Sequence, residues 1–148
     1  MTKPKQCPAC GAEGTVGSRA RTGRHANYRS VDVELPAKLK LTECTACNEL
    51  WLDDVESDAY SAAVDVAYHA ELRRRACEAL AQIEHVATQR HLERLLHLSH
   101  GYLSKVKNHA KAPSATHVGQ LALLAADPSP RLAELERFWS GAAKKATS

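Results

Sequence analysis

The segments Cys7-Pro8-Ala9-Cys10-Gly11 and Cys44-Thr45-Ala46-Cys47-Asn48 decide the fold of the amino-terminal part of this chain. In each segment two residues separate a pair of cysteines, and a tight turn between them aims both thiols at one point. Gly11 and Asn48 follow the pairs, and both residue types tolerate the left-handed backbone that such a turn requires. The two segments therefore predict the two halves of one tetrahedral four-sulfur metal site.

A structural zinc ion, one Zn²⁺ per chain, is the expected occupant. The predicted ligands are the four cysteines of the two segments: Cys7, Cys10, Cys44 and Cys47. Four thiolates leave no coordination position for a reactive water molecule, so the metal is expected to hold the fold. Iron in a rubredoxin-like site and a redox role are the alternatives, and the redox role is disfavoured because neither pair lies in a βαβ pattern.

The chain between the cysteine pairs has the character of short strands. Residues 28–35 and 39–44 alternate imperfectly between polar and apolar side chains, which predicts a hairpin joining the two segments. The first fifty residues contain few large aliphatic side chains, and small domains of this kind usually need a metal. We therefore expect a zinc ribbon with a short β-hairpin over residues 1–52.

Composition restricts the class of protein. No segment approaches the roughly 18 consecutive apolar residues of a membrane span, and residues 1–6 lack the apolar part of a secretion signal. We therefore expect a cytoplasmic protein with no membrane contact, in a compartment where paired cysteines bind metals. The net charge of +3 does not by itself indicate a nucleic-acid partner, but the excess of lysine and arginine lies after residue 85.

A linking helix is expected over residues 53–75. Acidic side chains gather at its start, where the positive end of the helix dipole favours them. An apolar stripe follows at helical spacing: Val55, Ala59, Ala62, Val66 and Ala70. This stripe connects the domains, packs against a second copy of the chain, or covers the zinc ribbon. The run of arginines at 73–75 ends the segment and is a phosphate contact or a solvated charge run.

Residues 88–108 predict two short helices joined by a turn. Thr88 caps the first, whose inward face carries leucines: Leu92, Leu95 and Leu96. Ser99 caps the second helix, expected over residues 100–108. At about 100° per residue its apolar side chains fall on one side: Tyr102, Leu103 and Val106.

The opposite side of the second helix carries small or hydrogen-bonding side chains. Such a face suits the major groove of DNA, where bulky apolar groups obstruct and donors reach base edges or phosphates. The predicted DNA-binding residues are Gln89, Ser99, His100, Gly101, Ser104, Lys105, Lys107 and Asn108, with Lys105 as first choice.

Two more helices are expected after this pair. Ser114 caps a helix whose inward residues complete a small core: Val118, Leu121 and Leu124. Pro130 suits the first position of the final helix. The apolar stripe of that helix is core or dimer interface: Leu132, Leu135, Phe138 and Trp139. Cys77 is expected to be a small buried hydrophobe, and the histidines are expected to be exposed or to contact phosphate, because their spacing fits no metal site.

The segments Gln89-Arg90-His91-Leu92, Leu98-Ser99 and Leu103-Ser104-Lys105-Val106-Lys107-Asn108, followed by Pro113, resemble the XRE-type helix-turn-helix. With the cysteine pairs and Glu56-Ser57-Asp58-Ala59, residues 7–127 resemble the MqsA/YgiT-type zinc-finger antitoxins. The resemblance implies an α+β, mostly α fold with three parts. These are a zinc-ribbon domain (1–52), a linking helix (53–75) and a five-helix XRE-type helix-turn-helix DNA-binding domain (76–148).

The resemblance also implies a function. Such proteins are homodimers whose carboxyl-terminal domain binds a palindromic operator in double-stranded DNA and represses its own operon. Their zinc domain neutralises a protein toxin, commonly an mRNA interferase. The family's recognition residues fall on Gly101 and Lys105, and the missing side chain at Gly101 points to a different operator sequence. His97 and His109 stand where the family pattern usually has glycine.

Two other functions compete with an autoregulating antitoxin of a type II toxin-antitoxin system. A stand-alone zinc-ribbon and helix-turn-helix transcription regulator would share every feature of this chain, because the two differ in a partner. An enzyme is disfavoured because the sequence has no nucleophile motif, no phosphate loop, no open metal site and no recognisable pair of carboxylates.

Overall fold

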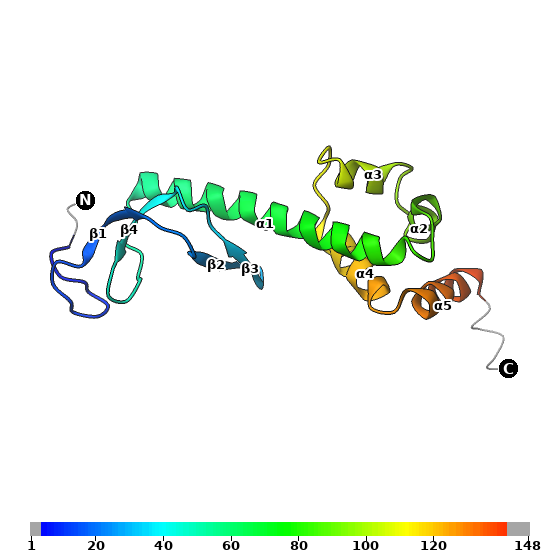
Figure 1. Ribbon diagram of the computed structural model, residues 1–148, viewed down its shortest axis with the longest axis horizontal. Coiled ribbons are helices and arrows are strands. Elements are labelled where there is room, and N and C mark those ends of the chain that lie inside the picture. The colour runs from blue at the N-terminus through cyan, green and yellow to red at the C-terminus, as the bar shows by residue number, and fades with distance from the viewer. Residues whose placement is uncertain (1–3, 142–148) are drawn as a thin grey trace. The chain divides into compact units, whose positions relative to one another are not determined.

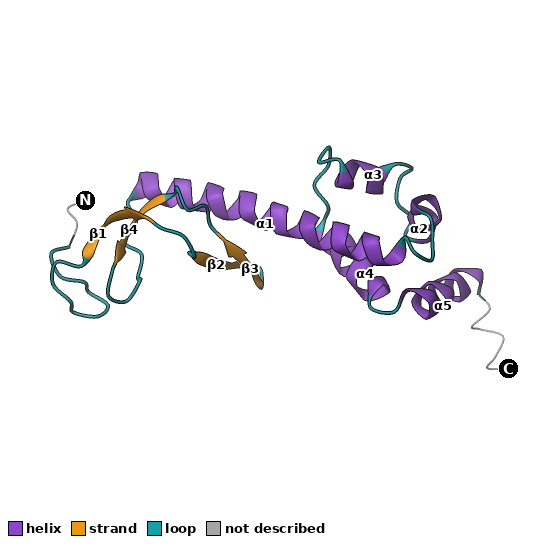
Figure 2. Cartoon of the chain, in the orientation of Figure 1, coloured by secondary structure: helices purple, strands orange, loops and turns teal. Residues whose placement is uncertain are grey.

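The computed structural model describes residues 4–141, and Figure 1 shows the order of the elements. These residues divide into two compact units, with the boundary between Tyr68 and His69. The fold is α+β and mostly helical, as predicted: four short strands precede five helices. Figure 2 shows that all the strands come before the first helix. No helix among the described residues combines the length and apolar character needed to cross a bilayer.

The strands of unit 1 form two separate antiparallel pairs. β1 (Val16–Ala20) pairs with β4 (Lys40–Cys44), and β2 (His25–Tyr28) pairs with β3 (Val31–Glu34). The predicted hairpin between residues 28–35 and 39–44 is therefore wrong in its pairing, because 28–35 contains a turn of its own. That turn has positive φ at Arg29 (50°) and Ser30 (64°), the backbone of a type I′ turn.

The longest helix, α1 (Asp54–Ile83), begins with a reciprocal cap. The N–H of Glu56 donates to Oδ1 of Asp53 at 2.8 Å, and the N–H of Asp53 donates to Oε2 of Glu56 at 3.3 Å. This capping box satisfies two backbone donors that the helix itself leaves unpaired. The hydroxyl of Thr42 donates to the other oxygen of Glu56 at 2.8 Å, which ties the start of α1 to β4.

The buried face of α1 is not the predicted stripe. All five stripe residues are exposed, and Val55 and Val66 keep 78% and 69% of their surface. The buried residues instead recur at intervals of four: Val64, Tyr68, Leu72, Ala76 and Leu80. In unit 1 the ring of Tyr68 contacts that of Tyr28 edge-on at 5.1 Å. The helix therefore contacts the ribbon through Glu56 and Tyr68 and not through the stripe, whose pairing with a second copy stays a prediction.

The linking helix is longer than predicted. It continues past residue 75 to Ile83, so the arginine run lies inside it. Arg74 pairs with Glu71 at 2.8 Å and with Glu78 at 3.0 Å, while Arg75 pairs with Glu71 at 2.8 Å. These pairs are one helical turn apart, which is the arrangement of a solvated charge run on a helix surface.

Four shorter helices complete unit 2: α2 (Gln89–Leu95), α3 (Tyr102–Lys107), α4 (Ala115–Ala125) and α5 (Pro128–Ser140). Two predicted caps are confirmed, since the hydroxyls of Thr88 and Ser114 accept N–H groups of their helices at 3.2 Å. Two predicted helix starts are wrong. α3 begins after Gly101, which has a φ of 82°, and Ser99 is not its cap. α5 begins at Pro128 and not at Pro130.

The core of unit 2 contains most of the predicted apolar residues. The buried ones among them are Leu92, Leu95, Tyr102, Leu103, Val106, Val118, Leu121, Leu124 and Leu132, and Leu80 and Ile83 of α1 are buried as well. Two aromatic residues of the last helix are exposed: Phe138 keeps 65% of its surface and Trp139 keeps 50%, although the Trp139 ring stacks on that of His97 at 4.3 Å. The indole Nε1 of Trp139 also donates to the carbonyl of Leu95 at 2.8 Å. Cys77 is half-buried.

Candidate functional site

The four predicted metal ligands meet in unit 1. The Sγ atoms of Cys7, Cys10, Cys44 and Cys47 all lie within 4.8 Å of one another. Two Sγ–Sγ distances, Cys7 to Cys47 and Cys10 to Cys44, are 3.7 Å. A tetrahedral ion with metal–sulfur bonds of about 2.3 Å places its sulfur ligands about 3.8 Å apart. The cluster therefore has the dimensions of a site that could hold a metal ion such as zinc.

Both cysteine segments have the same backbone geometry. The N–H groups of Gly11 and Asn48 donate to the carbonyls of Cys7 and Cys44, each at 2.8 Å. The N–H of the first cysteine also donates to the carbonyl five residues later, at 2.9 Å in both segments. Gly11 and Asn48 have positive φ values of 76° and 63°, as their residue types predict.

The protonation of the thiols favours a cation at the centre of this cluster. The hydroxyl of Thr15 lies 3.1 Å from Sγ of Cys44, and this hydrogen bond lowers the pKa of Cys44 to about 6. At Cys47 the N–H of Glu49 lowers the pKa, but loss of solvent and the three neighbouring thiols outweigh it and raise the value to about 12. Four thiolates therefore coexist here only when a positive ion offsets their repulsion.

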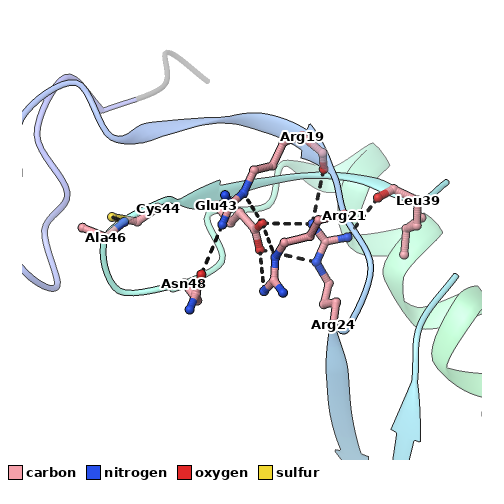
Figure 3. A network of polar contacts seen from close by, with 8 residues as sticks. All are labelled: Arg19, Arg21, Arg24, Leu39, Glu43, Cys44, Ala46 and Asn48. Atoms are coloured by element: carbon pink, nitrogen blue, oxygen red, sulfur yellow. Dashed lines mark hydrogen bonds and ion pairs between the residues drawn. The ribbon is translucent and has the colours of Figure 1, made fainter. Parts of the chain in front are cut away.

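A fully buried carboxylate adjoins Cys44 of the four-cysteine cluster. Glu43 has no exposed surface, and Figure 3 shows arginine side chains converging on it. Nε of Arg19 and Nε of Arg21 donate to Oε1, the latter at 2.7 Å, and Nη2 of Arg24 lies 3.2 Å from the same oxygen. Burial raises the pKa of Glu43, but the hydrogen bonds from Arg21, Arg24 and Arg19 prevail and lower it to about 2. The cluster could not be predicted from the sequence, because its members follow no recognised spacing.

In unit 2, α3 has the two faces that the sequence predicts. Tyr102, Leu103 and Val106 are buried, whereas Ser104 and Lys105 are exposed. Other predicted DNA-binding residues lie at the ends of this helix. Asn108 is its exposed C-cap, Gly101 its N-cap, and Ser99 and His100 are exposed in the turn before it, with 81% of the His100 side chain accessible.

The remaining two predicted contacts, Gln89 and Lys107, converge on Glu84. Nε2 of Gln89 and Nζ of Lys107 donate to the same oxygen, Oε1 of Glu84, at 3.0 and 2.6 Å. The hydrogen bonds from Gln89 and then Lys107 lower the pKa of Glu84. Glu84 therefore joins the start of α2 to the end of α3.

A second missed carboxylate, Glu93 of α2, fixes the start of α3. It is 4% exposed, and its two oxygens accept the N–H groups of Gly101 at 3.1 Å and Leu103 at 3.0 Å. These are donors that the first turn of a helix cannot satisfy itself. The sequence signal for this role was the position of Glu93, an acidic residue next to the inward-facing leucines of α2.

Both α2 and α3 end in a Schellman motif. The N–H of Leu98 donates to the carbonyl of Glu93 at 2.8 Å, and the N–H of Ala110 donates to that of Lys105 at 2.9 Å. This motif places one residue in the left-handed backbone region, usually glycine. His97 and His109 occupy these positions, with φ values of 53° and 62°.

A small hollow lies beside the turn that precedes α3. Its volume is about 210 Å³, and it is lined by Arg90, Glu93, Arg94, Leu98 and His100. The side chains of Arg90, Arg94 and His100 are exposed, so nitrogen donors lie around the opening.

No model of a known protein family matches this chain, and a search of curated proteins finds no significant match. The functional assignment therefore depends on the residues and contacts described above.

Proposed function

We propose that this protein is a transcription regulator that binds duplex DNA sequence-specifically through α3. The observation that carries the proposal is the exposure of Ser104, Lys105 and Asn108 on a helix whose other face is buried. Side chains of this kind reach base edges and phosphates when a helix enters the major groove. Lysine can donate to the O6 and N7 acceptors of guanine, so Lys105 is assigned a base or phosphate contact.

The contacts that hold α3 in position are consistent with DNA binding by this helix. A helix that recognises base edges must keep its orientation, because small displacements separate its side-chain donors from their acceptors on the bases. Glu93 holds the first turn of α3 through two backbone bonds, and Glu84 holds Lys107 near its end. Both carboxylates bind other residues of α3 or its N-cap, and Lys105 stays exposed.

Phosphate contacts beside α3 have a candidate location. The hollow near the helix start presents Arg90, Arg94 and His100, which can donate to a backbone phosphate. Such contacts fix the register of a protein on DNA while the exposed face of α3 reads the sequence. Arg90 and Arg94 thus join the residues proposed from the sequence.

We further propose that the four cysteines bind one structural Zn²⁺ and that the chain acts as a homodimer. A two-fold dimer places its two copies of α3 in half-sites about one helical turn apart, ~34 Å. The operator is then palindromic. The resemblance to the MqsA/YgiT type extends the proposal to a cytoplasmic antitoxin that represses its own operon and binds an mRNA interferase toxin through unit 1.

Selection from a random pool of duplexes tests DNA binding. The zinc-loaded protein should recover a two-fold-symmetric motif, and that duplex should shift the backbone amide signals of Ser104, Lys105 and Asn108 in NMR spectra. Amide signals of the exposed face of α5 are the internal reference. Recovery of no motif, or shifts confined to unit 1, would contradict the proposal.

Expression in the native cell separates the antitoxin from a stand-alone regulator. Deleting this gene while a neighbouring short reading frame is expressed should arrest growth if the neighbour is the toxin, and returning the gene should restore growth. Unimpaired growth with every neighbour would favour the stand-alone regulator.

A further inference from the structure

The arginine cluster of unit 1 carries more positive than negative charge. Three guanidinium groups, those of Arg19, Arg21 and Arg24, surround the single carboxylate of Glu43, as Figure 3 shows. The cluster therefore has a net charge of +2. Because Glu43 is fully buried while 33% of the Arg19 and 28% of the Arg21 side chains are accessible, the excess charge faces solvent.

The arginines differ in how many donors they use within the protein. Arg24 is 3% exposed and spends its three nitrogens on Glu43 and on the carbonyls of Leu39 and Arg19. Arg19 uses Nε for Glu43 and Nη2 for Asn48, and Arg21 uses Nε and Nη2 for Glu43. Within residues 4–141, no acceptor bonds to Nη1 of either Arg19 or Arg21. Each of these nitrogens carries two N–H groups, so two accessible arginines keep donors for another anion.

The strand beside the cluster leaves room for such an anion. Gly17 of β1 lies directly opposite Glu43 of β4, so both positions belong to the same face of the strand pair. Arg19 is two residues farther along β1 and projects to that face as well. Apart from its own chain neighbours, a Cβ atom built on Gly17 meets no described atom within 4 Å, which indicates open space at this position on the face that Arg19 shares.

We propose that Arg19 and Arg21, held in position by Glu43, bind a phosphate group in this space. A phosphate with a single ester bond, or free phosphate, carries about −1.5 to −2 charges at neutral pH and so balances the cluster. A carboxylate would leave half of the excess charge uncompensated. Guanidinium groups also match the spacing of phosphate oxygens with paired N–H donors. The ligand is free phosphate or the terminal phosphate of a nucleic-acid strand, and the site does not depend on DNA binding by α3.

A titration of the zinc-loaded full chain tests the proposal. Sodium phosphate replaces sodium chloride at constant ionic strength, while NMR follows the side-chain Nε–Hε signals of the arginines. The signals of Arg19 and Arg21 should shift and reach saturation. Arg21→Gln should weaken phosphate binding by about tenfold, the effect of losing charge-assisted hydrogen bonds.

The matched control is Arg29→Gln. Arg29 belongs to the same unit, and its guanidinium lies 5.2 Å from the ring centre of Tyr28 and takes no part in the cluster. This variant should bind phosphate as the unmodified protein does. Arg21→Lys keeps the charge without the paired donors and should be intermediate. If Arg21→Gln does not fold, the titration of the unmodified chain still tests whether Arg19 and Arg21 bind phosphate.

Two further titrations identify the ligand. A short single strand with a 5′-phosphate is compared with the same strand ending in a 5′-hydroxyl. Tighter binding of the phosphorylated strand, lost in Arg21→Gln, assigns the site to strand ends; equal binding with saturation by inorganic phosphate assigns it to the free ion. Absence of a saturable shift of Arg19 and Arg21, equal effects of Arg21→Gln and Arg29→Gln, or equally tight binding of an acidic peptide would overturn the proposal.

Discussion

Replacing Glu93 by glutamine tests how α3 is held. The carboxylate is almost completely buried and accepts two backbone N–H groups, those of Gly101 and Leu103. Hydrogen bonds to a charged group contribute about 1.5–3 kcal/mol each. Glutamine keeps one acceptor oxygen and turns an NH₂ group toward the other donor, so one of the two bonds is lost. We expect unit 2 to lose about 2–3 kcal/mol of unfolding free energy.

Fluorescence can follow this loss in unit 2 alone. The chain has two tryptophans, Trp51 in unit 1 and Trp139 in unit 2, so a Trp51→Phe background leaves one reporter. Urea unfolding of that background is compared with and without Glu93→Gln. The matched control is Glu134→Gln on α5, whose carboxylate is 57% exposed and should contribute less than about 0.5 kcal/mol. Equal stability of the two glutamine variants, with unchanged hydrogen exchange at Gly101 and Leu103, would refute the account of α3.

Three further predictions concern the metal, an ion pair and a helix end. Removing the metal with a chelator should collapse the NMR dispersion of the strands while the helices of unit 2 persist, because the four thiolates hold unit 1 through the ion; an unchanged ribbon would contradict this. Hydrogen bonds from Arg74 and Arg75 lower the pKa of Glu71 from 4.5 to about 2, so this carboxylate stabilises the fold above pH 4.5 and loses that effect as the pH falls toward 2. Glu71→Gln should therefore cost about 0.5 kcal/mol at neutral pH, after discounting for solvent screening, and nothing near pH 2 in urea titrations; a cost that is constant with pH would exclude the ion pair as its cause. His109→Gly should raise stability by about 1 kcal/mol because it relieves a left-handed backbone, and a loss of stability in thermal unfolding would oppose that explanation.

Local chemistry made several elements predictable. The cysteine spacing predicted the four-cysteine cluster, and the hydroxyls of Thr88 and Ser114 marked two helix starts, because each depends on residues within a single turn. The faces of α3 followed from helical periodicity. In each case the determining residues are neighbours in the chain.

The strand pairing and the buried face of α1 could not be predicted in the same way. The turn between β2 and β3 has Arg29 and Ser30 at positions that usually need glycine or asparagine, so the sequence carried no turn signal there. In α1, alanines and valines occur on opposite faces with similar apolar character. The larger Tyr68 and Leu72 are buried instead, and the aromatic partner of Tyr68 is the sequence-distant Tyr28.

The two buried carboxylates escaped prediction for the same reason. Glu43 is stabilised by arginines about twenty residues away, and Glu93 by backbone donors of the following helix. A charge is buried only when such partners are in place, and a single sequence does not state which residues they are.

The salt dependence of operator binding by Lys105→Ala tests whether α3 contacts DNA. Lys38→Ala, an exposed lysine of unit 1, is the control. We expect only Lys105→Ala to weaken binding: the salt slope falls by about one if Lys105 contacts a phosphate, and base preference relaxes with a loss of about 1–3 kcal/mol if it reads a guanine. Identical affinity, slope and base preference in Lys105→Ala and the unmodified protein would contradict the assignment of α3 to DNA.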